Sequence, residues 1–166
     1  MKKWIFFGLV FFACTSFRNI GVDLNEIRTL YKESVNSKKA CEKLIEISVS
    51  DETNSSLISG YKGCATIIMA KYFSNPFTKM SHFKNGKNIL EKAIGADENN
   101  IELRFLRFTV QTSTPAFLGY NHNLEMDKNF ILKFFHQIKD EKLKHFMMPF
   151  LKKSKYLSSE EKLQLI

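Results

Sequence analysis

Few residues in this chain interrupt a helix, and that scarcity constrains its fold more than any other feature of the sequence. The 166 residues include only three prolines and seven glycines. Leucine, isoleucine, lysine, glutamate and phenylalanine are abundant, and this composition favours helices. No stretch alternates apolar and polar residues as a half-buried strand does. The sequence therefore predicts an all-α protein.

Apolar residues recur at helical spacing along most of the chain. Asp23 and Glu26 form a capping-box pattern, and Leu24, Ile27 and Leu30 continue behind it on one face. Further helices are expected at about 41–48, 57–73, 76–94, 101–112, 130–138 and 140–151, with a short last helix after 158. We expect six to seven helices in stacked antiparallel hairpins.

The first sixteen residues have the order of a secretory signal peptide. Lys2 and Lys3 precede an uncharged apolar run, Trp4–Ala13, and Cys14–Ser16 supplies small residues for cleavage. The run is shorter than the roughly 20 apolar residues that cross a bilayer. The expected organisation has three parts: a signal peptide at 1–16, a short tail at 17–22 and a single helical domain at 23–166.

Cys14 leaves the processing of this segment open. Ala13 directly before a cysteine fits a lipoprotein signal, in which that cysteine becomes the lipidated first residue. Phe11 departs from the leucine-like residue usual three places earlier, so ordinary cleavage after a small residue is the other reading. In both readings the protein is exported to the periplasm or beyond, and in the first it is anchored to a membrane.

The chain is basic, with a formal net charge of +8. Because an exported protein rarely meets nucleic acid, we expect no nucleic-acid partner and favour an anionic lipid, a polysaccharide or an acidic protein surface. The simpler reading is a solvated lysine surface. Lysines are interleaved with phenylalanines between Lys128 and Lys155. This pattern fits either a basic helix on a membrane or closing helices with lysines outward.

Local motifs of catalysis and metal binding are absent from the sequence. His82, His122, His136 and His145 fit no HExxH or other dense ligand spacing. No nucleophile elbow, P-loop or dinucleotide fingerprint occurs. We expect no metal, no cofactor and no enzymatic activity, although a catalytic site assembled across the fold leaves no local pattern.

Cys41 and Cys64 are candidates for a disulfide bond. If the second and third helices form a hairpin around the loop 50–56, both cysteines lie level in it. An oxidising compartment favours the bond, which would contribute about 3 kcal/mol by closing this loop. The alternative is two small buried thiols.

Arginines supply the best polar candidates for binding. Arg104, Arg107 and Gln111 are spaced three and four residues apart and therefore share one face of the helix expected at 101–112. Guanidinium groups suit carboxylates and phosphates. We expect this face to bind a protein, a peptide or another anionic ligand.

Three further residues are expected to contribute to the same binding surface: Tyr61, Lys71 and Tyr120. The alternative is that Arg104 and Arg107 are structural. In that case they pair with local acids such as Glu102, or extend along the surface to water.

One segment carries a family resemblance. Gly86, Leu90 and Ala93 are a small residue, a large apolar residue four positions later and an alanine three further on, before a polar turn that ends at Asn100. Gly86–Asn100 resembles the second helix and turn of a tetratricopeptide repeat, and the likeness extends with insertions over Leu57–Thr112. The resemblance implies stacked helical hairpins, which commonly bind partners on a concave surface.

The chain is also similar, in its Asn-Pro, Leu-Arg-Phe and Phe-Leu-Gly-Tyr segments, to small exported bacterial proteins of unassigned function. The sequence thus favours a non-catalytic binding or scaffold module. A protein associated with a membrane surface through its basic C-terminal helices, lipidated or not, is the first alternative. An enzyme without a local motif is the second.

Overall fold

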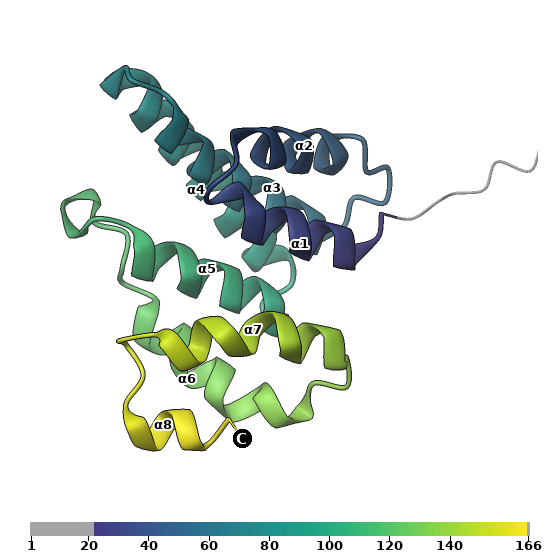
Figure 1. The fold of residues 1–166 in the computed structure, drawn as a ribbon, viewed down its shortest axis with the longest axis vertical. Coiled ribbons are helices and arrows are strands. Elements are labelled where there is room, and N and C mark those ends of the chain that lie inside the picture. Colours follow the sequence, from purple (N-terminus) through teal and green to yellow (C-terminus); the bar gives the residue numbers. More distant parts are fainter. Residues whose placement is uncertain (1–21, 166) are drawn as a thin grey trace, which may run out of the picture.

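The structure, a computed structural model, describes residues 22–165, and within them it is entirely helical (Figure 1). The eight α-helices are α1 (Leu24–Ser34), α2 (Lys38–Val49), α3 (Ser56–Met69), α4 (Pro76–Ala96), α5 (Ile101–Ser113), α6 (Leu124–Phe134), α7 (Glu141–Lys153) and α8 (Ser159–Leu163). Three 3-10 turns join them: η1 (Ala70–Tyr72), η2 (Ala116–Leu118) and η3 (Phe135–Gln137). The all-α prediction is confirmed for this part of the chain. The eight helices equal the number of segments expected from the apolar spacing, the short last one included, against the six to seven expected in the stack.

Polar residues cap the helices largely where the sequence placed them. Asn75 accepts hydrogen bonds from the backbone of Phe77 and Thr78 before Pro76 begins α4. Ser158 and Glu161 form the complete reciprocal capping box of α8. At the start of α5 the cap is Asn100, whose side chain accepts hydrogen bonds from the backbone of Glu102 and Leu103.

Consecutive helices pack against one another from α1 to α6. α1 lies on α2, α2 on α3 and α3 on α4, while α5 lies on α6 (Figure 1). Contacts of α5 with α3 and α7 join the first four helices to the last ones. None of the helices in the described range has the length and apolarity needed to span a bilayer.

The hairpin of α3 and α4 depends on two glycines. A Cβ atom on Gly63 would lie 2.7 Å from the backbone nitrogen of Leu90, and one on Gly86 would lie 2.5 Å from the carbonyl oxygen of Gly63. No side chain fits between backbones at this distance. The two helices therefore approach more closely than any larger residue would allow.

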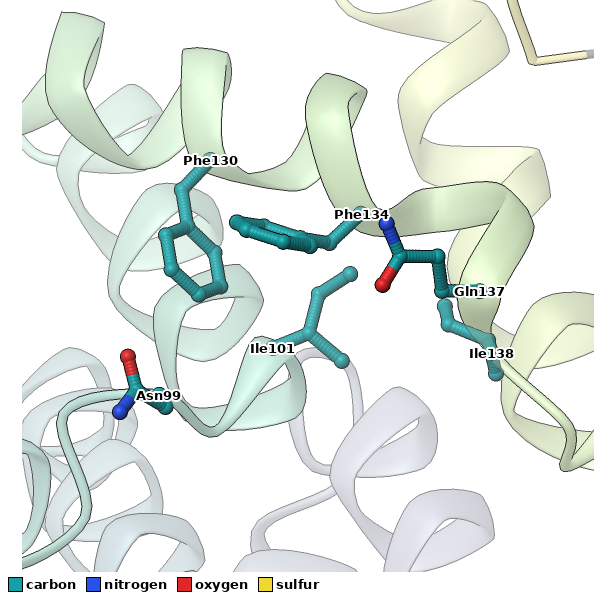
Figure 2. Close-up of a pocket in the computed structure, with 6 residues that line it drawn as sticks. All are labelled: Asn99, Ile101, Phe130, Phe134, Gln137 and Ile138. Carbon is teal, nitrogen blue, oxygen red and sulfur yellow. The ribbon is translucent and has the colours of Figure 1, made fainter.

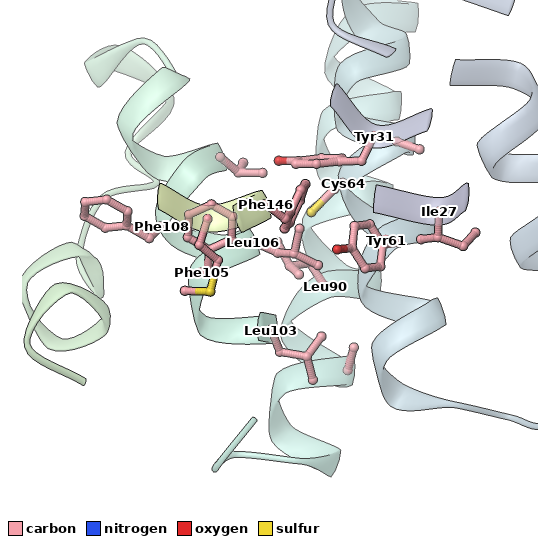
Figure 3. Close-up of a cluster of buried hydrophobic side chains, with 14 of the residues drawn as sticks. Ile27, Tyr31, Tyr61, Cys64, Leu90, Leu103, Phe105, Leu106, Phe108 and Phe146 are labelled. Atoms are coloured by element: carbon pink, nitrogen blue, oxygen red, sulfur yellow. The ribbon is translucent and has the colours of Figure 1, made fainter. Parts of the chain in front are cut away.

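Aromatic side chains fill the core where the N-terminal helices meet α5 and α7 (Figure 3). The ring of Tyr31 packs edge-on against Tyr61 at 5.6 Å and against Phe146 at 6.1 Å. Phe105 packs edge-on against the other side of Phe146, at 5.6 Å. Such pairs add to the stability that burial itself provides. They make one continuous core from α1 to α7.

Candidate functional site

Arg107 lies at the centre of a buried ion-pair network. It is 3% exposed, and its Nε and Nη2 donate to the two carboxylate oxygens of Asp127 at 2.6 and 2.8 Å. Its Nη1 donates to Glu91 Oε2 at 2.7 Å, and the hydroxyl of Tyr120 donates to Glu91 Oε1 at 2.5 Å. Burial acts to lower the pKa of Arg107, but the hydrogen bond and charge of Asp127 outweigh it and hold the pKa above its usual value.

Arg104 lies at the edge of the same network. Its Nη1 donates to Asp127 Oδ1 at 3.2 Å and its Nε to the carbonyl oxygen of Glu98 at 2.9 Å. Both arginines therefore pair with acids, as the structural alternative held. Their partners are Asp127 and Glu91, and Glu102 is not among them. Every nitrogen of the Arg107 guanidinium donates to a carboxylate and the side chain is buried, so an anionic ligand does not reach it.

The six residues expected to form one surface do not meet on one. Gln111 is buried, and neither atom of its amide has a hydrogen-bond partner among the described residues. Tyr61 and Tyr120 are buried in different networks. Lys71 is exposed in η1, where its Nζ donates to the carbonyl oxygen of Val35 at 2.5 Å. These six residues therefore do not form a shared ligand surface.

Sequence reasoning missed a second buried network, around Arg28. Its Nε and Nη2 donate to the two carboxylate oxygens of Glu102, each at 2.8 Å, and its Nη1 donates to Asp140 at 2.8 Å. Tyr61 donates its hydroxyl to the same Glu102 at 2.5 Å. A signal was present, since Arg28 stands four residues after Leu24, on an otherwise apolar helix face.

The predicted disulfide is absent. Cys41 and Cys64 are both free and buried, and the Cys41 thiol donates to the carbonyl oxygen of Ala65 at 3.1 Å. Burial raises the pKa of Cys41 to about 11 and that of Cys64 further still. Buried, protonated thiols are poor nucleophiles, so the geometry matches the alternative of two small core residues.

The basic region between Lys128 and Lys155 turns its apolar side inward. Phe135 and Phe146 are buried, and the remaining phenylalanines of the region are half-buried. Lys128 pairs with Glu125 and Glu161 and so ties α6 to α8. These features match the reading of closing helices, because the phenylalanines are not free to enter a membrane.

A pocket of about 280 Å³ opens where the start of α5 faces the end of α6 (Figure 2). Its lining residues are Asn99, Ile101, Phe130, Phe134, Gln137 and Ile138. The rings of Phe130 and Phe134 lie 4.6 Å apart and form one apolar wall, which Ile101 faces from α5. Asn99 and Gln137 place amide groups at opposite ends of it.

Two cations stand beside the aromatic wall of this pocket. The Arg104 guanidinium lies 5.3 Å from the ring of Phe130, and Lys133 Nζ lies 5.2 Å from the ring of Phe134. Arg104 is already held by Asp127, whereas Lys133 is exposed and forms no ion pair with the described acids. The volume is at the lower end of small-molecule sites and suits one large apolar side chain.

The described part of the chain contains no cluster of side chains suited to a metal ion. No group of three or more His, Cys, Asp or Glu side chains between residues 22 and 165 could hold an ion. His136 Nε2 and His145 Nδ1 lie within hydrogen-bond distance of the carbonyl oxygens of Gln164 and Glu141. These histidines therefore have local backbone partners.

The expected signal peptide and the lipidation candidate Cys14 lie outside the described residues. Comparisons of the chain with protein-family models, with curated proteins and with solved structures gave no match.

Proposed function

We propose that this chain is an exported, non-catalytic binding module that holds an apolar side chain of a protein or peptide in the pocket between α5 and α6. The pocket carries the proposal. It combines the aromatic wall of Phe130 and Phe134 with the amides of Asn99 and Gln137, which can hydrogen-bond to a peptide backbone on either side of the inserted residue.

The cations beside the pocket set the preferred neighbour of that apolar residue. Because Arg104 is paired with Asp127, the exposed Lys133 is the cation that can meet a new carboxylate. We therefore propose a ligand segment in which an acidic residue or a terminal carboxylate adjoins a leucine-like or phenylalanine-like side chain. The sequence also led us to expect an anionic ligand, but the proposed contact is now Lys133 and no longer the face of Arg107.

A tetratricopeptide-like arrangement is part of the proposal. Consecutive helices pack on one another from α1 to α6, and Gly86, Leu90 and Ala93 lie on the buried side of α4, as the second helix of such a repeat requires. Gly63 supplies the small residue on the partner helix. These observations support a rigid stack of hairpins that presents fixed helix ends, and the pocket lies at such ends.

The test uses three small probes and backbone-amide NMR spectra of the full chain. N-acetyl-leucinamide should shift signals of the pocket residues, with a Kd of about 1 mM for a ligand of this size. N-acetylglycinamide should not shift them, because it has no side chain to insert. N-acetyl-leucine, which carries a carboxylate, should bind several-fold more tightly than the neutral amide.

Matched variants decide whether the pocket is responsible. Phe134→Ala should abolish the leucine-dependent shifts, and Lys133→Gln should remove only the advantage of the carboxylate. Lys152→Gln, an exposed change on α7, is the charge-matched control and should leave both effects. Shifts scattered over the surface, or retained in a folded Phe134→Ala protein, would contradict the proposal.

A further inference from the structure

The α3–α4 hairpin carries a long segment without acidic residues. Between Glu52 and Glu91 the chain holds no aspartate and no glutamate but five lysines. Glu91, the acid at its C-terminal end, is engaged by Arg107 and Tyr120. None of Lys79, Lys84 and Lys87 forms an ion pair with an acid of the described chain. Among charged side chains, this segment of α3, η1 and α4 therefore carries only cationic ones.

The same hairpin exposes large apolar side chains. Phe77, in the first turn of α4, is 86% exposed, and Met80 is 37% exposed. Gly86 and Leu90, which are buried on α4, lie on the side of the helix opposite Phe77, whereas the buried Phe83 follows Met80 by three residues and lies nearer to it. Phe77 therefore belongs to the outward face of α4, and its exposure does not result from fraying at the edge of the core.

Helical spacing brings the apolar and cationic groups onto one stripe. Met80 and Lys84 follow Phe77 by three and seven residues, and Lys87 comes three residues after Lys84. At about 1.5 Å per residue, Lys84 lies about 10 Å along the axis from Phe77. An outward face that begins with Phe and Met and continues with lysines is the pattern of helices that lie in the interface of a membrane.

A second exposed phenylalanine lies on a loop packed against α4. Phe117, in η2, is 84% exposed. Three residues later, Tyr120 packs edge-on against Phe83 at 6.0 Å, and Lys87 Nζ lies 4.9 Å from the Tyr120 ring. Figure 1 shows this loop and the N-terminal end of α4 at the same side of the molecule, where the hairpin projects beyond the other helices.

We propose that this surface, Phe77, Met80, Lys84, Lys87 and Phe117, binds an anionic lipid surface. Charge complementarity favours anionic headgroups, which three unpaired lysines on α4 would attract. The exposure of both phenylalanines favours lipid over a folded partner. A side chain that stands clear of its neighbours enters a fluid interface without a complementary pocket, whereas a protein interface needs matched shape.

This surface is distinct from the basic region at Lys128–Lys155 and from the α5–α6 pocket. In the basic region every phenylalanine is buried or half-buried, whereas Phe77 on α4 is 86% exposed. The inference stands independently of the proposed peptide pocket. Failure of one would leave the other intact, because the two tests use different probes and different residues.

Vesicle sedimentation of the full chain tests the proposal. Vesicles with about one third phosphatidylglycerol should bind the protein, and pure phosphatidylcholine vesicles should bind it at least tenfold less. Raising the salt from about 0.05 M to about 0.5 M should weaken binding, since it screens the lysines. Phe77→Ser with Phe117→Ser, and separately Lys84→Gln with Lys87→Gln, should each lower the partition coefficient about tenfold or more.

The matched control is Lys152→Gln with Lys153→Gln, which removes two exposed charges on α7 and should keep binding intact. Residues 1–21 are the same in every variant, so differences report the α4 surface alone. Thermal unfolding should be unchanged, because all substituted side chains are exposed or half-buried. Equal binding by all variants would overturn the proposal.

Fluorescence locates the contact directly. Phe77→Trp should shift its emission to the blue and become quenched by brominated lipid on vesicle binding, whereas Val49→Trp, on exposed α2, should do neither. Binding that needs the lysines but not the phenylalanines would assign the surface to a soluble polyanion. Self-association that is lost in Phe77→Ser, without vesicle binding, would assign it to a second copy of the chain. Either result would refute the lipid proposal.

Discussion

Arg28 and Glu102, 74 positions apart in the sequence, are joined by two parallel hydrogen bonds of 2.8 Å. The pair is buried, and it connects α1 to α5. The hydroxyl of Tyr61 on α3 and the carboxylate of Asp140 at the start of α7 bind to the same pair. Four segments that are distant in the chain thus share one charged cluster.

Removing one partner of this pair should destabilise the protein strongly. Arg28→Met leaves the Glu102 carboxylate buried beside a neutral side chain, and we expect a loss of about 3–5 kcal/mol in the free energy of unfolding. Arg28→Met with Glu102→Gln should recover most of that loss, since no buried charge remains and Tyr61 keeps an acceptor. Urea unfolding monitored by circular dichroism measures both. A single-variant loss below about 1 kcal/mol would show that the pair is solvated.

The two arginines of α5 should behave differently from each other. Arg107→Gln leaves the fully buried Asp127 without its main cation, so we expect a loss of about 3–5 kcal/mol. Arg104→Gln removes a longer and more exposed contact to an aspartate that Arg107 still holds, and should cost about 1 kcal/mol. Thermal unfolding of the two variants in parallel checks the order. Equal, small losses would restore the view of this face as a ligand surface.

Glycines at the α3–α4 contact should be irreplaceable. Gly63→Ala or Gly86→Ala puts a Cβ within 2.7 Å of backbone atoms that cannot move aside, and should cost about 1–3 kcal/mol or more. Gly95→Ala is the control, because its Cβ would meet nothing within 4 Å. There alanine should raise stability by about 0.5–1 kcal/mol through helix propensity. Denaturant midpoints of the three variants provide the comparison.

Local signals predicted the helices well, because caps and apolar spacing act within a few residues. The starts of α4 at Pro76 and of α8 after Ser158 agree with the segments expected from the sequence, 76–94 and after 158. Glu102 shows the limit of such reasoning. Its position suggested a partner for Arg104 and Arg107 nearby, yet its carboxylate binds Arg28 from another helix. Only the tertiary packing brings that partner close.

The candidate pocket was beyond local reasoning for a similar reason. Asn99, in the connection between α4 and α5, and Ile101, at the start of α5, form one side of its lining. The distant segment 130–138 forms the other side. The phenylalanines of that segment were expected on a core face, but the chain tightens into η3 after Phe134. Phe130 and Phe134, four residues apart on α6, are half-buried and open to the pocket, whereas Phe135 in η3 and Ile138 after it are buried. No spacing rule in the sequence predicts where an α-helix becomes a 3-10 turn.

Thiol labelling should distinguish free cysteines from a disulfide. In a Cys14→Ser chain, iodoacetamide at mildly alkaline pH should label neither Cys41 nor Cys64 in the folded protein, because both thiols are buried and burial raises their pKa values. After unfolding in urea without reductant, both should be labelled. Mass spectrometry counts the labels. Labelling that requires a reductant would mean that the two cysteines are bonded after all.

Alkaline pH should unfold the protein through its buried phenols and thiols. Burial holds the pKa values of Tyr31, Tyr61 and Tyr120 above the ordinary 10.0, and that of Cys41 at about 11 against 9.0. At pH values between the ordinary pKa of each group and its raised pKa in the folded protein, the unfolded chain loses protons that the folded chain keeps. The folded state therefore binds more protons, and the free energy of unfolding falls as pH rises. The free energy of unfolding should thus be highest below about pH 9 and decline steadily above it. Tyrosinate absorbance should show the three buried tyrosines ionising together in the same pH step that abolishes the helical circular dichroism. Gradual ionisation of all tyrosines in a protein that stays helical would show that these phenols are open to water.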